Sequence, residues 1–460
     1  MKKLIGNRRF YERVLYITIP IMIQNGITNF VSLLDNIMVG QVGTEPMSGV
    51  AIVNQLTFVY SLCIFGGLSG AGIFGAQYYG QGNQEGIRET FRFKVWIGLL
   101  ILILGLSIFF TSGDTLIRLY LNDGNAESTA AALHYGQQYL WIMMIGLVPF
   151  TIVQIYSSTL RETGETLLPM KAGIAAVCVN MMFNYVLIFG KLGMPALGVA
   201  GAAIATTLAR FTECIVVVVW THCHKERNPY IKGIYRSLRV SRELIWKIIC
   251  KGSPLLCNEA LWSAGMAVLL QCYSVRGLNV VAGMNISNTI GNLFNIVFVS
   301  LGSAVSIIVG QLLGAGKMEE AKDTAGKLIF FSVVCCIGVG AVMALISPFF
   351  PRIYNTSDEV RYLARWFIVV AAICMPLQAF TNATYFTLRS GGRTFITFLF
   401  DSVFVWVVSV PLAFVLSRYT DLHIILVYFC CQFMDIVKCI IGFWMVKKGI
   451  WLQNIVETTA

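Results

Sequence analysis

Twelve long, predominantly apolar segments follow one another along this chain of 460 residues, and they constrain its fold more than any other feature. A helix needs about 20 such residues to cross the hydrocarbon core of a bilayer. Within that core, backbone polar groups are satisfied only in helices and closed barrels, and apolar runs of this length are typical of helices. We therefore predict an all-α membrane protein with twelve transmembrane helices. The predicted spans are residues 14–39, 50–78, 95–112, 129–160, 168–190, 200–222, 253–275, 284–313, 328–347, 360–388, 395–416 and 424–446.

The composition agrees with a membrane protein and excludes several other classes. Hydrophobic residues make up 57% of the chain and charged residues 12%, against about 45–50% and about 25% in soluble domains. This balance excludes a soluble enzyme, a disulfide scaffold and a disordered protein. The net charge of +11 is spread over short loops and forms no continuous face. We therefore expect the lipid bilayer, and no nucleic acid, as a partner.

The basic residues predict the orientation of the chain. Of the 34 Lys and Arg residues, 25 lie at the two termini and in the loops on the same side as the termini, and 7 lie in the opposite loops. Lys and Arg accumulate on the cytoplasmic side of membrane proteins. We therefore expect a multi-pass protein of the plasma membrane with both termini in the cytoplasm.

The two halves of the sequence repeat each other. An offset of 234 residues maps Gly49 onto Gly283, Gln77 onto Gln311 and Gly80 onto Gly314, and a later offset of 228 maps segment 160–166 onto 388–394. Six spans per copy make the copies parallel repeats related by an axis along the membrane normal. We predict two pseudo-symmetric six-helix bundles, residues 1–222 and 252–460. The cytoplasmic basic linker between them, residues 223–251, is expected to be solvated and to face an anionic leaflet.

Two parallel lobes are typical of a secondary transporter rather than an enzyme. The phosphate-binding motif GxxxxGK[ST] is absent from the sequence, so ATP is not expected to drive transport directly. No set of His, Cys or Asp residues has catalytic spacing, and we predict neither a cofactor nor an enzymatic activity. The energy is expected to come from an ion gradient.

Polar and charged side chains inside the spans are the candidate functional residues, because burying them is costly. Asp35 lies late in the first span, in its outer half, and is either an interfacial carboxylate or a cation or proton site. Asn180 and Asn184 are one helical turn apart in the fifth span and share a face. Their amide oxygens suit a hard cation such as Na⁺, or steady a nearby carboxylate; hydrogen bonding between helices is the alternative.

The second half offers its own candidates for a substrate or cation site. They are Glu259, Asn285, Asn288, Gln378 and Asn382. Glu259 is a lone glutamate in an apolar helix, which favours a functional role. Asp401 is expected to be structural or capping, and Asp435 and Lys438, three residues apart, to neutralise each other.

Several motifs resemble the multidrug and toxic compound extrusion (MATE) family. They are Asn-x-x-x-Asn-Tyr-Val-Leu-Ile-Phe-Gly at 180–190, Gly-x-Pro-x-Leu-Gly-Val-x-Gly-Ala-Ala-x-Ala-Thr at 193–206, the segment 20–40 with Asp35, and the paired Leu-Arg-x-x-Gly-x-Thr corners at 160–166 and 388–394. The resemblance covers nearly the whole chain. It implies two six-helix bundles arranged as a V, which export organic, often cationic, compounds in exchange for Na⁺ or H⁺.

The resemblance also implies roles for particular residues. Asp35, Asn180, Asn184 and Thr206 match the cation site of the first lobe, with Asn184 where some relatives have aspartate. Glu259 matches a glutamate of one branch of the family, but Gln378 stands where that branch has an aspartate. Of the two carboxylates in that branch's second-lobe Na⁺ site, only one is therefore present in this sequence.

The prediction is thus a monomeric, cation-coupled antiporter for small organic substrates, with Na⁺ or H⁺ as the coupling ion and no metal site beyond a possible Na⁺ at Asp35. The alternative within the same broader superfamily is a lipid-linked oligosaccharide flippase, which predicts a cationic cavity for pyrophosphate, whereas these spans contain almost no Lys or Arg. A major facilitator transporter is less consistent with the sequence, because the loop at 80–89 lacks its basic and acidic motif.

Overall fold

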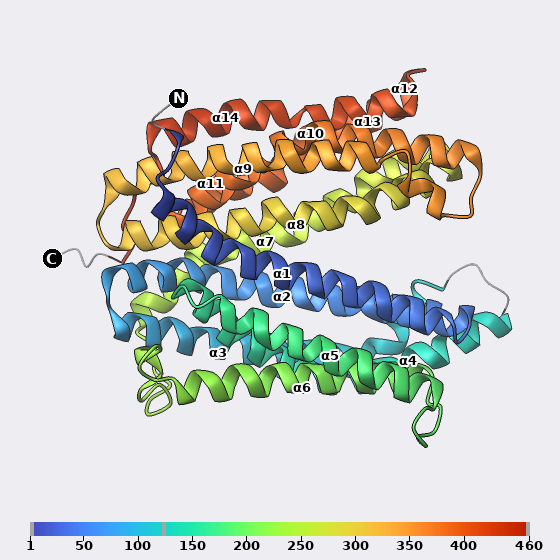
Figure 1. Ribbon diagram of the computed structural model, residues 1–460, viewed down its shortest axis with the longest axis horizontal. Coiled ribbons are helices and arrows are strands. Elements are labelled where there is room, and N and C mark those ends of the chain that lie inside the picture. The colour runs from blue at the N-terminus through green and yellow to red at the C-terminus, as the bar shows by residue number, and fades with distance from the viewer. Residues whose placement is uncertain (1–3, 122–125, 457–460) are drawn as a thin grey trace. The chain divides into compact units, whose positions relative to one another are not determined.

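The computed structural model describes residues 4–121 and 126–456, and every regular element within them is helical (Figure 1). In this part of the chain, twelve helices are long and apolar enough to cross a membrane, which confirms the predicted number and fold class. The first six are α1 (Arg8–Gly40), α2 (Thr44–Gln81), α3 (Gln84–Arg118), α4 (Ala126–Glu162), α5 (Leu167–Phe189) and α6 (Val199–Cys223). The next four are α7 (Arg242–Ser274), α8 (Leu278–Gly314), α9 (Met318–Ile346) and α10 (Asp358–Ser390).

The last two spans are interrupted helices. The eleventh begins as α11 (Thr394–Phe398), continues through two π-helical segments at Leu399–Val403 and Val405–Ser409, and ends as α12 (Val410–Tyr419). The twelfth consists of α13 (Ile424–Phe433) and α14 (Asp435–Lys448), separated by a single residue. Single-turn π segments interrupt the regular hydrogen bonding of α-helices and frequently mark functional sites.

Three helices extend well beyond the predicted spans. Segments 84–94, 242–252 and 318–327 were expected outside the membrane helices, and the structure places them in the first turns of α3, α7 and α9. They are rich in Glu, Lys and Arg, which are good helix formers, and acidic residues occupy the first turn of all three helices. Hydropathy detects only the apolar part of such a helix, because its charged end continues into water.

The internal repeat is visible in the backbone. α2 and α8 end in the same way: Gly82 and Gly316 have left-handed φ angles of +78° and +74°. Their N–H groups donate to the carbonyls of Tyr79 and Leu313, at 3.0 and 3.1 Å. Both ends are the Schellman type of helix termination, in which glycine avoids the cost of a positive φ. All four residues obey the 234-residue offset, so the predicted pseudo-symmetry is confirmed.

The repeat also creates a reciprocal close approach. A Cβ atom added to Gly80 would lie 2.8 Å from Cα of Gln311, and one added to Gly314 would lie 2.6 Å from Cα of Gln77. The same two residue types, at positions related by the offset, therefore meet twice. The ends of α2 and α8 cross with backbone against backbone, a separation that only glycine permits.

Contacts divide the chain into two compact units. The amino-terminal unit is Ile23–Gly75 with Gln84–Ile248, and the carboxy-terminal unit is Met1–Met22, Ala76–Asn83 and Ile249–Ala460. Within the amino-terminal unit, α4 packs on α3 and α6, and α6 packs on α5. Within the carboxy-terminal unit, α10 is central and contacts α8, α9, α13 and α14.

The expectation of a solvated linker was wrong for part of residues 223–251. Tyr230, Ile231 and Ile234 are buried against the amino-terminal unit, and the segment from Arg242 onward is already helix α7. Three apolar residues among many charges give little hydropathy signal, yet burying them stabilises this contact by removing apolar surface from water.

Candidate functional site

Asp35, Asn184, Asn180 and Thr206 form a closed ring of hydrogen bonds within the amino-terminal unit. The side-chain amide of Asn184 donates to Oδ1 of Asp35 at 2.5 Å and to Oδ1 of Asn180 at 3.0 Å. Asn180 in turn donates to the hydroxyl of Thr206 at 3.2 Å, and Thr206 is also a hydrogen-bond partner of Asp35. The ring joins α1, α5 and α6, so the four residues matched to the first-lobe cation site are neighbours in the structure.

The secondary structure explains why these side chains meet. Asn180 and Asn184 are separated by one turn of α5, which places them on one face, and both are buried, at 2% and 1% exposure. Asp35 and Thr206 are only half-buried. The ring is therefore closed on the α5 side and more accessible on the α1 and α6 side.

One acceptor in the ring has no partner. Oδ1 of Asn184 is buried without a hydrogen bond, and a buried polar atom left unpaired is unfavourable. This oxygen belongs to the amide that binds Asp35, the one carboxylate of the ring. The amide nitrogen now faces the carboxylate, so turning the amide over would bring this oxygen to Asp35 as a second ligand for a hard cation.

Two side chains beside the ring were not predicted from the sequence. The Tyr139 hydroxyl donates to Oδ1 of Asn54 at 3.4 Å and also lies within hydrogen-bonding range of Thr206. Tyr139 is 2% exposed. Neither residue stands out in sequence, because a polar residue in a long span has no local signal that shows which helix it will face.

Arg210 adds a positive charge to the same region. It follows Thr206 by one turn of α6, lies within electrostatic range of Asp35, and holds its guanidinium 5.2 Å from the ring centroid of Phe150. Its Nη1 atom is buried without a hydrogen bond. The sequence did contain a signal here, since Arg210 is a basic residue inside a span, four positions after a candidate site residue.

The five candidates of the second half do not come together in the same way. Gln378 donates to Oε1 of Gln432 at 3.1 Å, and Asn285 and Asn288 are exposed. Asn382 keeps a buried Oδ1 without a partner. Glu259 is half-buried and within electrostatic range of Arg389 and Asp401. In the described residues, no hydrogen bond joins these candidates to one another.

A different charged cluster lies in the carboxy-terminal unit instead. The ammonium of Lys438 is 3.4 Å from Oδ1 of Asp401 and 3.8 Å from Oδ1 of Asp435, so it neutralises both carboxylates rather than Asp435 alone. Asn258 donates to Oδ2 of Asp401 at 3.2 Å, and Ser402 donates to Asn258. Asp401 lies in the first π-helical segment, so its role is an ion pair inside the bundle and not a helix cap.

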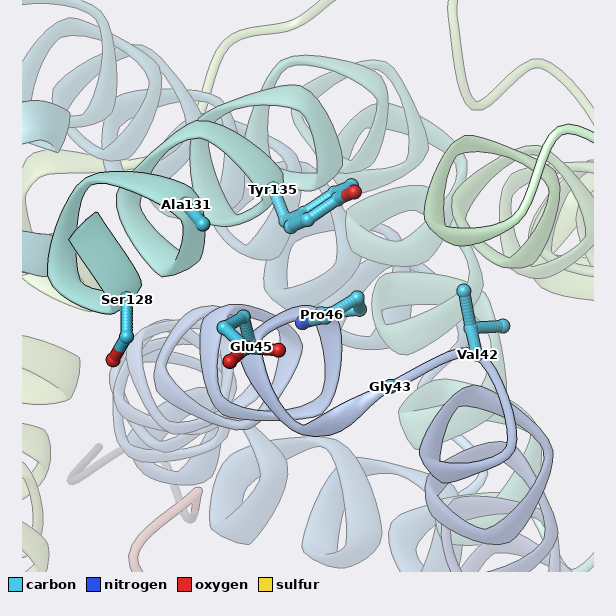
Figure 2. Close-up of a pocket in the computed structure, with 7 residues that line it drawn as sticks. All are labelled: Val42, Gly43, Glu45, Pro46, Ser128, Ala131 and Tyr135. Atoms are coloured by element: carbon cyan, nitrogen blue, oxygen red, sulfur yellow. The ribbon is translucent and has the colours of Figure 1, made fainter.

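A cavity of about 430 Å³ opens between the α1–α2 connection and the first turns of α4 (Figure 2). It is lined by Val42, Gly43, Glu45, Pro46, Ser128, Ala131 and Tyr135. The cavity lies at the same end of α1 as Asp35, which precedes Val42 by seven residues, or about 10 Å along a helix axis. Figure 2 shows Glu45 and Tyr135 on facing sides of the opening.

Known proteins of the same architecture match this chain over nearly its full length. The probable multidrug resistance protein NorM of Thermotoga maritima is 23% identical over 90% of this chain and 87% of its own. The probable multidrug resistance protein YoeA of Bacillus subtilis is 27% identical over 88% and 87%. Among solved structures, an outward-facing multidrug resistance MATE family transporter of the MOP superfamily superimposes with a TM-score of 0.86 at 20% identity, covering 99% of this chain and 98% of that one.

A MOP superfamily transporter from Pyrococcus furiosus gives a TM-score of 0.85 at 20% identity, covering 97% of both chains. At these identities the structures establish the fold. The family model for MatE matches residues 20–186 and 254–415, one match in each repeat. Because these two segments make up well over half of the chain, this membrane protein belongs to the MatE family of transporters.

Proposed function

We propose that this chain is a cation-coupled antiporter that exports organic, cationic or amphipathic compounds by alternating access, using Na⁺ or H⁺ as the coupling ion. The observation that carries the proposal is the hydrogen-bonded ring around Asp35. It holds one carboxylate between three helices and leaves the buried amide oxygen of Asn184 without a hydrogen bond. The multidrug resistance names of the relatives support the substrate class.

Neutralisation of Asp35 is the proposed coupling step. Hydrogen bonds to an ionised acceptor are about twice as strong as those to a neutral one. A proton or Na⁺ on Asp35 would therefore weaken the bonds that Asn184 and Thr206 make to it, and would loosen α1 from α5 and α6. Ion binding drives transport only if one lobe arrangement binds the ion better than the other. In this proposal the loosened arrangement releases the substrate outside.

The proposal also covers the location, oligomeric state and orientation of the protein. It places the chain in the plasma membrane as a monomer, with both termini in the cytoplasm. The end of α1 near Asp35 then faces outward, and the cavity around Glu45 and Tyr135 is the entry for the coupling ion. The 25 basic residues on the opposite side support this orientation.

The test is transport by an Asp35→Asn variant. Purified protein is reconstituted in liposomes, a Na⁺ or H⁺ gradient is imposed separately, and the flux of a fluorescent organic cation is measured. The amide keeps the shape of the side chain and removes its titratable charge. We expect gradient-driven flux to fall to the level of empty liposomes, and the wild type to respond to one of the two gradients.

The matched control is Asp114→Asn, an exposed aspartate of α3 in the same unit. It should transport as the wild type does. Undiminished coupled export by Asp35→Asn would overturn the proposed role of the ring. A wild type that moves no organic compound under either gradient, but moves a lipid-linked oligosaccharide, would favour the flippase instead.

A further inference from the structure

The linker between the two repeats is bound lengthwise to α3 by a ladder of side-chain donors. Arg88, Arg92 and Trp96 follow one another at intervals of one helical turn. They donate to the backbone carbonyls of linker residues 230, 234 and 238, at 3.0, 3.1 and 3.0 Å. Both partners advance by four residues per rung, so the linker runs in register with the helix.

Further contacts attach the linker to α3 and α4. The hydroxyl of Ser241 donates to Oε2 of Glu89 at 2.8 Å. Tyr230 is 2% exposed and lies beside Glu162 at the end of α4; burial raises the pKa of its phenol, which keeps the side chain neutral. Tyr235 hydrogen-bonds to Tyr156 of α4. The segment is thus an ordered part of the amino-terminal unit.

The basic side chains of this segment point away from these contacts. Lys225, Arg227, Lys232, Arg236 and Arg239, here named the basic strip, are all exposed. Within the linker as the structure describes it, none of the five forms an ion pair, and Glu226 is the one acidic residue between them. The rungs fall at 230, 234 and 238, so Lys232 and Arg236 lie midway between rungs.

α3 shows how deep the basic strip lies relative to lipid. Trp96 is 51% exposed, and three residues later an exposed apolar face begins, which includes Leu99, Leu100, Ile103 and Leu104. That face suits the hydrocarbon, and tryptophan prefers the interface. At 1.5 Å per residue, the Trp96 rung is about 4–5 Å from the start of this face, the Arg92 rung about 10 Å and the Arg88 rung about 16 Å.

We propose that the end of the basic strip nearest the hydrocarbon, Arg236 and Arg239 with Lys232 behind them, binds the phosphate groups of anionic phospholipids in the leaflet at this end of the helices. A headgroup region is about 5–8 Å thick on each side of the hydrocarbon. The segment around Leu238, with Arg236 and Arg239, therefore lies at headgroup depth, while Lys232, midway between the rungs at about 10 and 16 Å, lies about 5 Å beyond its outer edge. Exposed Tyr235 and Leu238 add apolar contact at the same level.

The ladder makes this surface different from a flexible basic tail. A disordered segment loses conformational entropy when it binds, whereas a segment already fixed on its scaffold does not. The carbonyls used by the ladder are engaged by α3, and the side chains between them are left for the lipid. The positive charges of Arg236 and Arg239 match the lipid phosphates in sign, and the ladder holds them at headgroup depth.

The experiment measures lipid binding by the full-length protein in detergent. Native mass spectrometry counts the phosphatidylglycerol and phosphatidylcholine molecules retained during a titration with each lipid. The test variant is Lys232→Gln/Arg236→Gln/Arg239→Gln. We expect its apparent affinity for phosphatidylglycerol to fall about tenfold or more, and its affinity for phosphatidylcholine to stay unchanged. The control, Lys317→Gln/Lys322→Gln/Lys447→Gln, removes three exposed charges outside the linker and should retain wild-type binding.

A second variant tests whether lipid binding depends on the ordered position of the strip as well as on its charge. Trp96→Phe/Ser241→Ala keeps every charge and removes two attachments of the linker. We expect a weaker preference for phosphatidylglycerol over phosphatidylcholine, with the elution volume of a folded protein. The proposal would be overturned if the test and control triple variants lost equal affinity for phosphatidylglycerol. It would also be overturned if the test triple variant or the double variant kept the lipid preference of the wild type.

Discussion

At the scale of single residues, the amino-terminal unit contains a buried ion pair. The ammonium of Lys94 lies 2.6 and 2.7 Å from the two carboxylate oxygens of Glu162 and 3.0 Å from the hydroxyl of Thr159. Lys94 is 0% exposed and joins α3 to α4 close to the Leu-Arg-x-x-Gly-x-Thr corner. Such a pair contributes little net stability compared with apolar residues, but losing one partner leaves a charge buried alone.

The first prediction concerns this pair. Lys94→Met removes the ammonium that contacts both carboxylate oxygens of Glu162 and should destabilise the protein by about 3–5 kcal/mol. The double variant Lys94→Met/Glu162→Leu should regain most of that loss. The measurement is the fraction of protein that stays monodisperse in detergent after heating. Equal stability of the single and double variants would show that the loss of stability does not come from the charge imbalance.

The residues of the candidate ring differ in how far the sequence predicts them. Asn180 and Asn184 are one turn apart, so their shared face follows from helix geometry alone. Asp35 and Thr206 were joined to them through the MATE resemblance. Tyr139, Asn54 and the environment of Arg210 depend on which faces of α2, α4 and α6 meet, and that is decided by packing of the whole unit. No local pattern carries this information.

At the scale of helices, the crossing of α2 and α8 is a contact that leaves no room for a side chain. Gly80 faces backbone atoms of Gln311, which cannot move aside as a flexible side chain can. The apolar runs predicted both helices, but they contained no sign of the crossing. The charged first turns of α3, α7 and α9 and the π-helical segments of the eleventh span were likewise missed. Hydropathy indicates only which part of a helix suits lipid. The π segments contact α7 through Ser402 and Trp406, which donate to Asn258 and Leu261, and no local pattern indicates these contacts.

The second prediction tests the crossing. Gly80→Ala places a methyl group against the backbone of α8 and should destabilise the protein by about 1–3 kcal/mol, as overpacking does. Gly338→Ala in α9 is the control, because nothing lies within 4 Å of its added Cβ atom. Alanine is the better helix former, so the control should be neutral or slightly more stable. Thermal unfolding in detergent gives both values, and equal stability of the two variants would contradict the close approach.

At the scale of the whole molecule, the sequence settles the number of spans but leaves the orientation as a prediction. The span α6 separates the α5–α6 loop from the linker, so the two lie on opposite sides of the membrane, and the bias of basic residues predicts that the linker is on the cytoplasmic side. Leu192, at 88% exposure, and Lys225, also exposed, mark the two sides.

The third prediction uses these two positions. In a background with the natural cysteines replaced, Leu192→Cys should react with a membrane-impermeant maleimide in intact cells. Lys225→Cys should react only after permeabilisation. Both proteins should label fully in detergent, which controls for burial. The reverse pattern would place both termini outside and would exclude the outward-facing role proposed for Asp35.

The reciprocal approach of Gly80 to Gln311 and Gly314 to Gln77 has a consequence for the origin of the chain. Each half carries one glycine and one glutamine three residues before it, so each half contains both surfaces of the joint. A protein of only six spans with that pair is self-complementary and can meet a second copy of itself about a two-fold axis. The present polypeptide is then equivalent to such a homodimer whose subunits have been fused end to end.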